Sequence, residues 1–346
     1  MNARGWLAVT IGAVGLFGAD AASAQQSDGV AKFYQGKQMN MVIYSEAGSA
    51  YDVYARLLAR HMGRHIPGSP IFVPQQMPGA GGLKATDYLY NIAPKDGLIV
   101  GSISRGNPFE PLLGSTKTNF DPLKFTWLGS MNREVSVAVS WYTVPVKTID
   151  DLKNRELITP GTGAGADSQI IPLAINNLVG TKFKIIPGYS STGRSLLALE
   201  QGELEGIGYW SWSAVKAGKP DWIKDHKINI IFHTGAKEYP ELPGVPMIRD
   251  YAKNDTDRKA LDLLLAREVL GRPFVAPPGL PADRAKALEA AFSATFKDAD
   301  FLADAEKIRA DIELVTGEEV VAVLKEVFAY PPSVIERTKD ILNRIQ

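Results

Sequence analysis

The chain of 346 residues contains no cysteine. Disulfides, thiolate metal sites and cysteine nucleophiles are therefore excluded, and we expect no lipid anchor attached through an N-terminal cysteine. An excess of either charge is also lacking: 38 basic and 38 acidic residues balance, so we expect neither nucleic acid nor an anionic membrane surface as a partner. Apolar residues at 45% indicate a globular protein, and the length suffices for two domains.

Histidine is scarce, with four residues in the whole chain. His61 and His65 are four positions apart on an expected helix, which is the spacing of a metal-binding pair. The intervening residues lack the glutamate of H-E-x-x-H, and no third ligand is evident, so we expect a solvated helix face and no metal. No Ser/His/Asp set, nucleophile elbow or acid–base carboxylate pair is readable, which disfavours an enzyme.

Long apolar runs are absent except near the N-terminus. There, Arg4 precedes an apolar segment at residues 6–18, and Ala22-Ser23-Ala24 forms an A-x-A processing signal. The segment is too short to span a bilayer comfortably. These features predict a signal peptide at residues 1–24, cleaved after Ala24, and a secreted mature protein; an uncleaved anchor is the alternative.

A strand, a small-residue loop and a helix follow one another between residues 41 and 62. Met41–Tyr44 is a short apolar run, and Ser45–Ala50 supplies the loop. Apolar side chains then recur at helical spacing from Tyr51 onwards. Asp52 lies in the first turn, where a carboxylate suits the helix dipole and caps amides. Unpaired backbone N–H groups at such a helix start can hold an anion.

A similar unit occurs at residues 157–179. Leu157–Thr159 is the expected strand, the loop Pro160–Ala166 reads PGTGAGA, and Asp167–Val179 is the expected helix. The two units would offer two helix N-termini to one ligand. The loop also satisfies a dinucleotide pattern, G-x-G-x-x-A, but no suitable acidic residue ends a following strand, so we expect no cofactor.

The rest of the chain continues the alternation of strands and helices. We expect strands at residues 71–73, 98–103, 125–129, 135–142, 183–186, 202–209, 228–232 and 271–276, and helices at 83–91, 148–154, 195–201, 258–267, 283–297 and 318–328. This alternation predicts an α/β protein with mainly parallel sheets.

Three ordered motifs carry a resemblance to a known family. ARLLA at residues 55–59, VPQQMPGAGG at 73–82 and APKDG at 93–97 follow the first loop in that order. This arrangement resembles the Bug-type periplasmic solute-binding proteins of tripartite tricarboxylate transporters. One departure is that Ala47-Gly48-Ser49 stands where the family has Pro-Gly-Gly, and Glu46 adds an acid just upstream.

The resemblance implies a two-lobed periplasmic binding protein, type II-like, with two crossing segments and the ligand in the interlobe cleft. We expect lobe one at residues 28–130 plus 237–346 and lobe two at 131–236. The implied function is a receptor that closes by a hinge motion on a small carboxylate and delivers it to membrane permease subunits, as a monomer without cofactor. A ligand-sensing partner of a membrane sensor kinase is an alternative, and a secreted α/β enzyme a weaker one.

The resemblance and the loops together nominate a set of ligand-binding residues. They are Glu46, Ala47, Gly48, Ser49, Ala50, Tyr51, Asp52, Ser104, Arg105, Gly163, Ala164, Gly165, Ala166, Asp167, Tyr189, Arg194, Tyr209 and Trp210.

Several of these candidates have a competing structural role. Arg194 is either a countercharge for a carboxylate or a solvated arginine at a helix start. For Tyr209 and Trp210 core packing is the favoured alternative to lining the cleft. Asp167 either caps its helix, which is the favoured interpretation, or repels an anion. Together with Glu46 it argues mildly against a multiply charged anion, whereas the aromatic side chains argue for a bulky solute.

Overall fold

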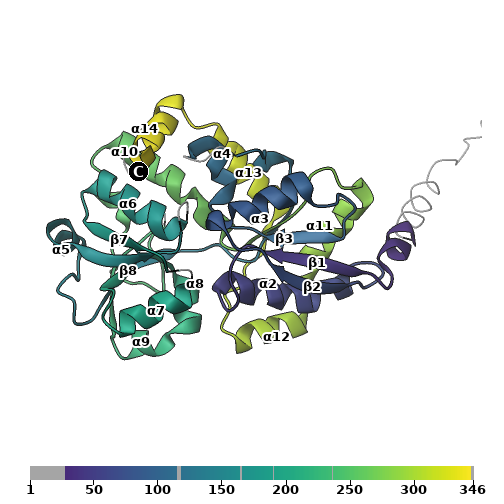
Figure 1. Ribbon diagram of the computed structural model, residues 1–346, viewed down its shortest axis with the longest axis horizontal. Coiled ribbons are helices and arrows are strands. Elements are labelled where there is room, and N and C mark those ends of the chain that lie inside the picture. The colour runs from purple at the N-terminus through teal and green to yellow at the C-terminus, as the bar shows by residue number, and fades with distance from the viewer. Residues whose placement is uncertain (1–27, 115–117, 164–165, 190, 236, 344–346) are drawn as a thin grey trace, which may run out of the picture.

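The computed structural model describes residues 28–114, 118–163, 166–189, 191–235 and 237–343. The predicted signal peptide and the candidates Ala164 and Gly165 lie outside the described residues. Figure 1 shows two α/β bodies side by side, each with strands inside and helices outside. We call the body built on the strands at residues 38–130 and 273–316 the first lobe, and the body built on the strands at residues 136–233 the second lobe.

The first lobe contains a sheet of six strands in the order β11-β4-β10-β3-β1-β2. Their bounds are β1 (Gln38–Ile43), β2 (Ile71–Gln76), β3 (Ile99–Ser102), β4 (Thr126–Ser130), β10 (Pro273–Ala276) and β11 (Val315–Thr316). Strand β1 is parallel to β2 and β3, whereas β10 is antiparallel to β3 and β4, and β11 to β4.

Helices cover both faces of this sheet because its strands alternate apolar side chains between the faces. Met41 and Ile43 of β1 are buried with α2 (Ala50–His61), α11 (Ala282–Thr295) and α12 (Ala299–Lys307). Val42 between them is buried in the other cluster, with α3 (Leu83–Asp87) and α13 (Gly317–Phe328).

The second lobe contains a sheet of three strands in the order β8-β5-β9 and a pair of strands, β6 and β7. Their bounds are β5 (Ser136–Trp141), β6 (Leu157–Gly161), β7 (Phe183–Pro187), β8 (Gly206–Ser211) and β9 (Ile228–His233). The helices of this lobe are α5 (Ile149–Asn154), α6 (Asp167–Val179), α7 (Thr192–Glu200), α8 (Trp212–Gly218) and α9 (Pro220–Lys224).

The prediction of mainly parallel sheets is wrong. Among the described strands, three pairs are parallel and five are antiparallel. The reason is long-range pairing: β10 comes from the C-terminal half of the chain and enters between β3 and β4 in the opposite direction. Strand β5 likewise pairs on both sides with strands that follow it by more than sixty residues.

The C-terminal helices lie across both lobes. Helix α14 (Pro332–Asn343) contacts α10 (Asp255–Leu265), α4 (Glu110–Leu113) and α6 of the second lobe. The strands separate into the two sets of residues expected from the sequence, but the exact lobe borders stay a proposal. None of the described helices is both long and apolar enough to cross a membrane.

The N-terminus of α13 illustrates how local sequence starts these helices. The Thr316 hydroxyl accepts a hydrogen bond from the Glu319 N–H at 3.2 Å, and the Glu319 carboxylate accepts one from the Thr316 N–H at 2.8 Å. This reciprocal capping box satisfies two amides that the helix itself leaves unpaired.

Replacing Thr316 with alanine removes one half of this capping box. We expect T316A to lower the free energy of unfolding by about 1 kcal/mol, since the Glu319 amide loses its acceptor. Urea denaturation measures the change. The control variant T316S retains the hydroxyl and is expected to stay within a few tenths of a kcal/mol of the parent chain; equal losses in both variants would contradict the capping role.

Candidate functional site

The loop between β1 and α2 is held in shape by its own side chains. One Asp52 oxygen accepts a hydrogen bond from the Gly48 N–H at 2.9 Å, and the other accepts from Arg56 at 2.8 Å and Gln76 at 3.1 Å. The Ser49 hydroxyl accepts from the Asp52 N–H at 3.2 Å. The expected capping role of Asp52 is confirmed, and the side chain is buried within the protein's own contacts.

The same loop leaves backbone donors at the start of α2. In the described part of the chain, no hydrogen bond engages the N–H groups of Ala50 and Tyr51, the first two residues of the helix. Glu46 is half-buried, whereas Ala47 and Gly48 are exposed. This end of α2 therefore presents free amides beside an accessible loop.

Aromatic and cationic groups surround this helix end. The Tyr51 ring contacts the Tyr44 ring edge-on at 4.6 Å between centroids, and the Arg272 guanidinium lies 4.7 Å from the centre of the Tyr51 ring. Burial, followed by the influence of Tyr51, raises the pKa of Tyr44 well above its ordinary value. Tyr44 is therefore a neutral hydrogen-bonding group over the whole physiological range.

Arg105 lies just beyond the end of β3 and is 3% exposed. Its Nη1 donates to a Glu268 oxygen at 2.5 Å, its Nη2 donates to the Ser136 hydroxyl at 2.9 Å, and its Nε lies 3.3 Å from an Asp167 oxygen. The guanidinium also lies 5.1 Å from the centre of the Tyr209 ring. One side chain from the first lobe thus contacts β5, α6 and β8 of the second.

Asp167, the first residue of α6, joins Arg105 to a second arginine. Its other oxygen accepts a hydrogen bond from Nη1 of Arg267, whose Nε donates to the Leu264 carbonyl at 2.8 Å. Burial alone would raise the pKa of Asp167, but Arg267 and Arg105 more than offset it and hold that pKa below its ordinary value. Asp167 is therefore ionised and shared between two guanidinium groups.

Glu268 completes this group of charges. One of its oxygens accepts hydrogen bonds from the Tyr209 hydroxyl at 2.6 Å and from the Thr234 hydroxyl at 2.7 Å, while the other accepts from Arg105. Burial raises the pKa of Tyr209 well above its ordinary value, so its hydroxyl stays a donor. We call Arg105, Asp167, Tyr209, Arg267 and Glu268 the interlobe cluster.

A second buried ion pair lies nearby. Arg272 Nη2 is 3.2 Å from a Glu134 oxygen, and Glu134 also accepts from the backbone N–H groups of Val135 at 3.1 Å and Ser213 at 3.2 Å. Glu134 belongs to the segment that passes from β4 to β5, so this ion pair lies where the chain crosses between the lobes.

The structure brings four of the candidate side chains together. Arg105, Asp167 and Tyr209 belong to the interlobe cluster, and Tyr51 is near enough to act electrostatically on Arg105. Ser104 is buried beside Arg105. Asp167 does not cap α6 with its side chain, so the favoured interpretation of this residue is wrong: its oxygens are taken by the two arginines.

Other candidates lie elsewhere. Trp210 points to the opposite face of β8 and packs on Trp222 at 6.2 Å between ring centroids, in agreement with the core-packing alternative. Arg194 is exposed and has no ion pair within the described residues. Tyr189 is half-buried and packs against the apolar core of the second lobe. Gly163 and Ala166 lie in the loop before α6, joined by a backbone bond of 3.1 Å.

Arg267, Glu268 and Arg272 were not among the candidates from the sequence. All three lie in the short stretch that ends in β10, residues 266–276. Because β10 is antiparallel to β3, the residues before β10 meet the residues after β3 at the same edge of the sheet. In the sequence, these residues stand out only as a group of charges next to a buried strand. If that strand were parallel to β3, the charges would lie at the opposite edge of the sheet.

The histidine pair has a structural role. His61 is buried, with Nε2 at 3.0 Å from Asp304 and Nδ1 at 2.9 Å from Arg64, and His65 lies 2.8 Å from Asp298. The prediction of a solvated face is therefore wrong for His61, because these contacts join the α2 region to α12. The described residues contain no group of three or more side chains suited to a metal ion.

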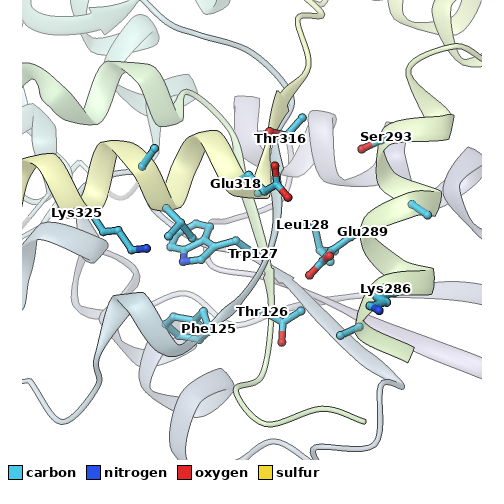
Figure 2. A pocket seen from close by; sticks show the side chains of 15 residues that line it. Phe125, Thr126, Trp127, Leu128, Lys286, Glu289, Ser293, Thr316, Glu318 and Lys325 are labelled. Atoms are coloured by element: carbon cyan, nitrogen blue, oxygen red, sulfur yellow. The ribbon is translucent and has the colours of Figure 1, made fainter. Parts of the chain in front are cut away.

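A surface hollow of about 800 Å³ lies between β4, α11 and α13 (Figure 2). Its lining includes Trp127, Lys286, Glu289, Glu318 and Lys325, and burial followed by the proximity of Glu318 raises the pKa of Glu289. None of the predicted ligand-binding residues lines this hollow. The interlobe cluster therefore remains the candidate site.

Comparison with known proteins decides the fold. No protein-family model and no curated protein matches the chain. Among solved structures, the periplasmic binding protein BugD superposes with a TM-score of 0.68 at 21% sequence identity, over 89% of this chain and 98% of that chain. MatC from Rhodopseudomonas palustris with bound malate gives 0.66 at 20% identity, over 88% and 99%. Rpa4515 of the same organism, with adipate, gives 0.66 at 20%, over 90% and 97%.

The chain has the two-lobed fold of the periplasmic binding proteins. The two-lobed α/β fold that the family resemblance implies is thereby confirmed. In this binding-protein fold, the interlobe cluster lies between the bodies that the family resemblance expects to enclose a ligand.

Removing one partner of the buried Arg105–Glu268 pair is expected to be strongly destabilising. R105M replaces the guanidinium side chain with an apolar one and leaves Glu268 buried without its cation. The free energy of unfolding should therefore fall by about 3–5 kcal/mol. In R105M/E268Q the uncompensated charge is gone, and the double variant should recover part of that loss. Denaturant unfolding tests both; a double variant less stable than R105M would contradict the assignment.

His233 predicts a pH dependence of stability. It is buried at the end of β9, where its Nδ1 accepts the Gly235 N–H at 3.1 Å, and burial lowers its pKa below the ordinary value of 6.5 although Asp250 partly opposes this. Below pH 6.5 His233 is protonated in the unfolded chain, whereas in the folded chain it is protonated only at lower pH. The free energy of unfolding therefore falls as the pH drops through 6.5.

The variant H233N keeps an acceptor for Gly235 but does not titrate. We expect the unfolding midpoint of H233N in urea to vary less than that of the parent chain between pH 7.5 and pH 5.5. Parallel pH profiles for the two proteins would show that His233 titrates in the folded state as it does in the unfolded state.

Proposed function

We propose that this chain is a periplasmic receptor that captures a small organic acid between its lobes and delivers it to the permease subunits of a tripartite tricarboxylate-type transport system. The observation that carries the proposal is Arg105, a first-lobe guanidinium that donates hydrogen bonds to β5 and α6 of the second lobe and lies over the Tyr209 ring of β8. A group bound at this position contacts both lobes at once, which is the requirement for ligand-driven hinge closure.

The known structures of the same fold support an acidic solute. The two Rhodopseudomonas palustris structures carry malate and adipate, which are both dicarboxylates. In this chain, the free amides of Ala50 and Tyr51 are suited to one carboxylate, and the arginines of the interlobe cluster are suited to another. The candidate residues at 46–52, 104–105 and 163–167 are the proposed binding set.

The remaining parts of the proposal follow from the sequence. Residues 1–24 act as a signal peptide cleaved after Ala24, the mature chain is a periplasmic monomer, and the lobes meet near residues 130 and 237. The absence of a readable nucleophile–base set favours a binding protein over an enzyme.

The experiment is a thermal-shift screen of residues 25–346 against organic acids, amino acids and neutral solutes, followed by calorimetric titration of each hit. An acid at 100 times its dissociation constant should stabilise the protein by about 2.7 kcal/mol. Hits confined to amines or neutral compounds would contradict an acidic solute, and chemical turnover of an acid would identify an enzyme instead.

The variant A50P tests the contribution of the α2 amides. Proline removes the Ala50 N–H, yet it is well tolerated at the first position of a helix, and the extended backbone of Ser49 suits a residue before proline. We expect A50P to bind the acid about 10-fold or more weakly, since a hydrogen bond to a charged group is lost. A299P makes the same change at the first position of α12 and should bind normally.

A further inference from the structure

Within this proposed receptor function, we infer that the Asp167 carboxylate occupies the position of a solute carboxylate in the interlobe cluster and thereby determines how tightly the receptor binds acids. Asp167 belongs to the second lobe, whereas Arg105 and Arg267 belong to the segments that follow β3 and precede β10 in the first. Its two oxygens contact one guanidinium each. An acid held between the lobes would make the same contacts.

The charges of the interlobe cluster are already balanced without a solute. Arg105 faces Glu268 and Asp167, and Arg267 faces Asp167, with Glu110 near enough to act on it electrostatically. No unmatched guanidinium charge is left within this group for an incoming anion. A solute carboxylate can gain a full ion pair here only by replacing a carboxylate of the protein.

Asp167 is the carboxylate that can be replaced. Glu268 is held by Arg105 and by the hydroxyl groups of Tyr209 and Thr234. The described residues supply the side chain of Asp167 with guanidinium contacts alone, and its contact to Arg105, at 3.3 Å, is longer than that of Glu268, at 2.5 Å. Displacing Asp167 therefore breaks two hydrogen bonds, whereas displacing Glu268 breaks three. Of the two carboxylates bound to Arg105, Asp167 also has the longer bond.

The close approach of these groups is built into the backbone. A Cβ atom added at Gly106 would lie 2.6 Å from an Asp167 oxygen and 2.7 Å from Arg267 Nη1. Only glycine leaves room for the carboxylate to reach both arginines. An acid that displaces Asp167 thus puts its own carboxylate into a space that already fits one. Because Asp167 competes for this space, the affinity of the receptor for acids is reduced.

Acetate tests the inference without knowledge of the solute. D167A removes the carboxylate group, and acetate carries an equivalent carboxylate on a methyl group. We expect the unfolding temperature of D167A to fall below that of the parent chain and to rise again with sodium acetate, relative to sodium chloride of equal ionic strength. The parent chain should show no such acetate-specific rise. D167L, which fills the space with apolar atoms, should show none either.

D167N gives a second readout that does not depend on a vacated space. It is isosteric with aspartate but removes one negative charge, so its affinity for an acid found in the screen should rise about 10-fold or more over the parent chain. An equal or weaker affinity would overturn the inference, as would an acetate response shared by D167A, D167L and the parent chain.

The two proposals fail separately in this design. Acetate rescue of D167A with no acid bound by any variant would support the internal carboxylate and contradict the acidic solute of the proposed receptor. Acid binding that is indifferent to Asp167, with no acetate rescue, would leave the receptor function in place and overturn the internal carboxylate.

Discussion

A buried guanidinium is the constraint on which the arrangement of the two lobes depends. Arg105 is removed from water, and the free-energy penalty of burying its charge requires carboxylates and hydrogen-bond acceptors around it. No single segment supplies them: Ser136 begins β5, Asp167 begins α6, and Glu268 precedes β10. These elements lie far apart in the chain. The groups that stabilise the charge of Arg105 therefore come from both lobes, which meet at this side chain.

The second ion pair differs from the first in where it lies. Glu134 is part of a crossing segment and accepts two backbone N–H groups as well as Arg272, so its position is set by main chain. Asp167 is held by side chains alone within the described residues. In the proposed hinge motion, the Glu134 contact belongs near the pivot, whereas the Asp167 contacts are among the interlobe contacts that opening would break.

The local structure was predictable where neighbouring residues decide it. The bounds of α6 at residues 167 and 179, the capped helix that starts after Thr148 and the buried apolar run from Met41 to Ile43 in β1 all follow from short-range patterns. The members of the interlobe cluster were only partly predictable. Asp167 and Tyr209 lie in motifs that stand out locally, but Arg267 and Glu268 join the site through the antiparallel direction of β10, and strand direction across 170 residues leaves no local periodicity.

Asp167 shows why a residue at a helix start is ambiguous in the sequence. An aspartate there gains about 0.3–1 kcal/mol from the helix dipole at a surface position, which is enough to explain its presence without any ligand. The structure adds two buried guanidinium groups, whose uncompensated desolvation would cost several kcal/mol each. The free-energy cost of desolvating the arginines is larger than the gain from the helix dipole. The main effect of the carboxylate is therefore to stabilise the two guanidinium groups. Because the carboxylate of an acid has the same charge and shape, the feature that stabilises the two arginines is also the one that an acid would replace under the inference drawn above.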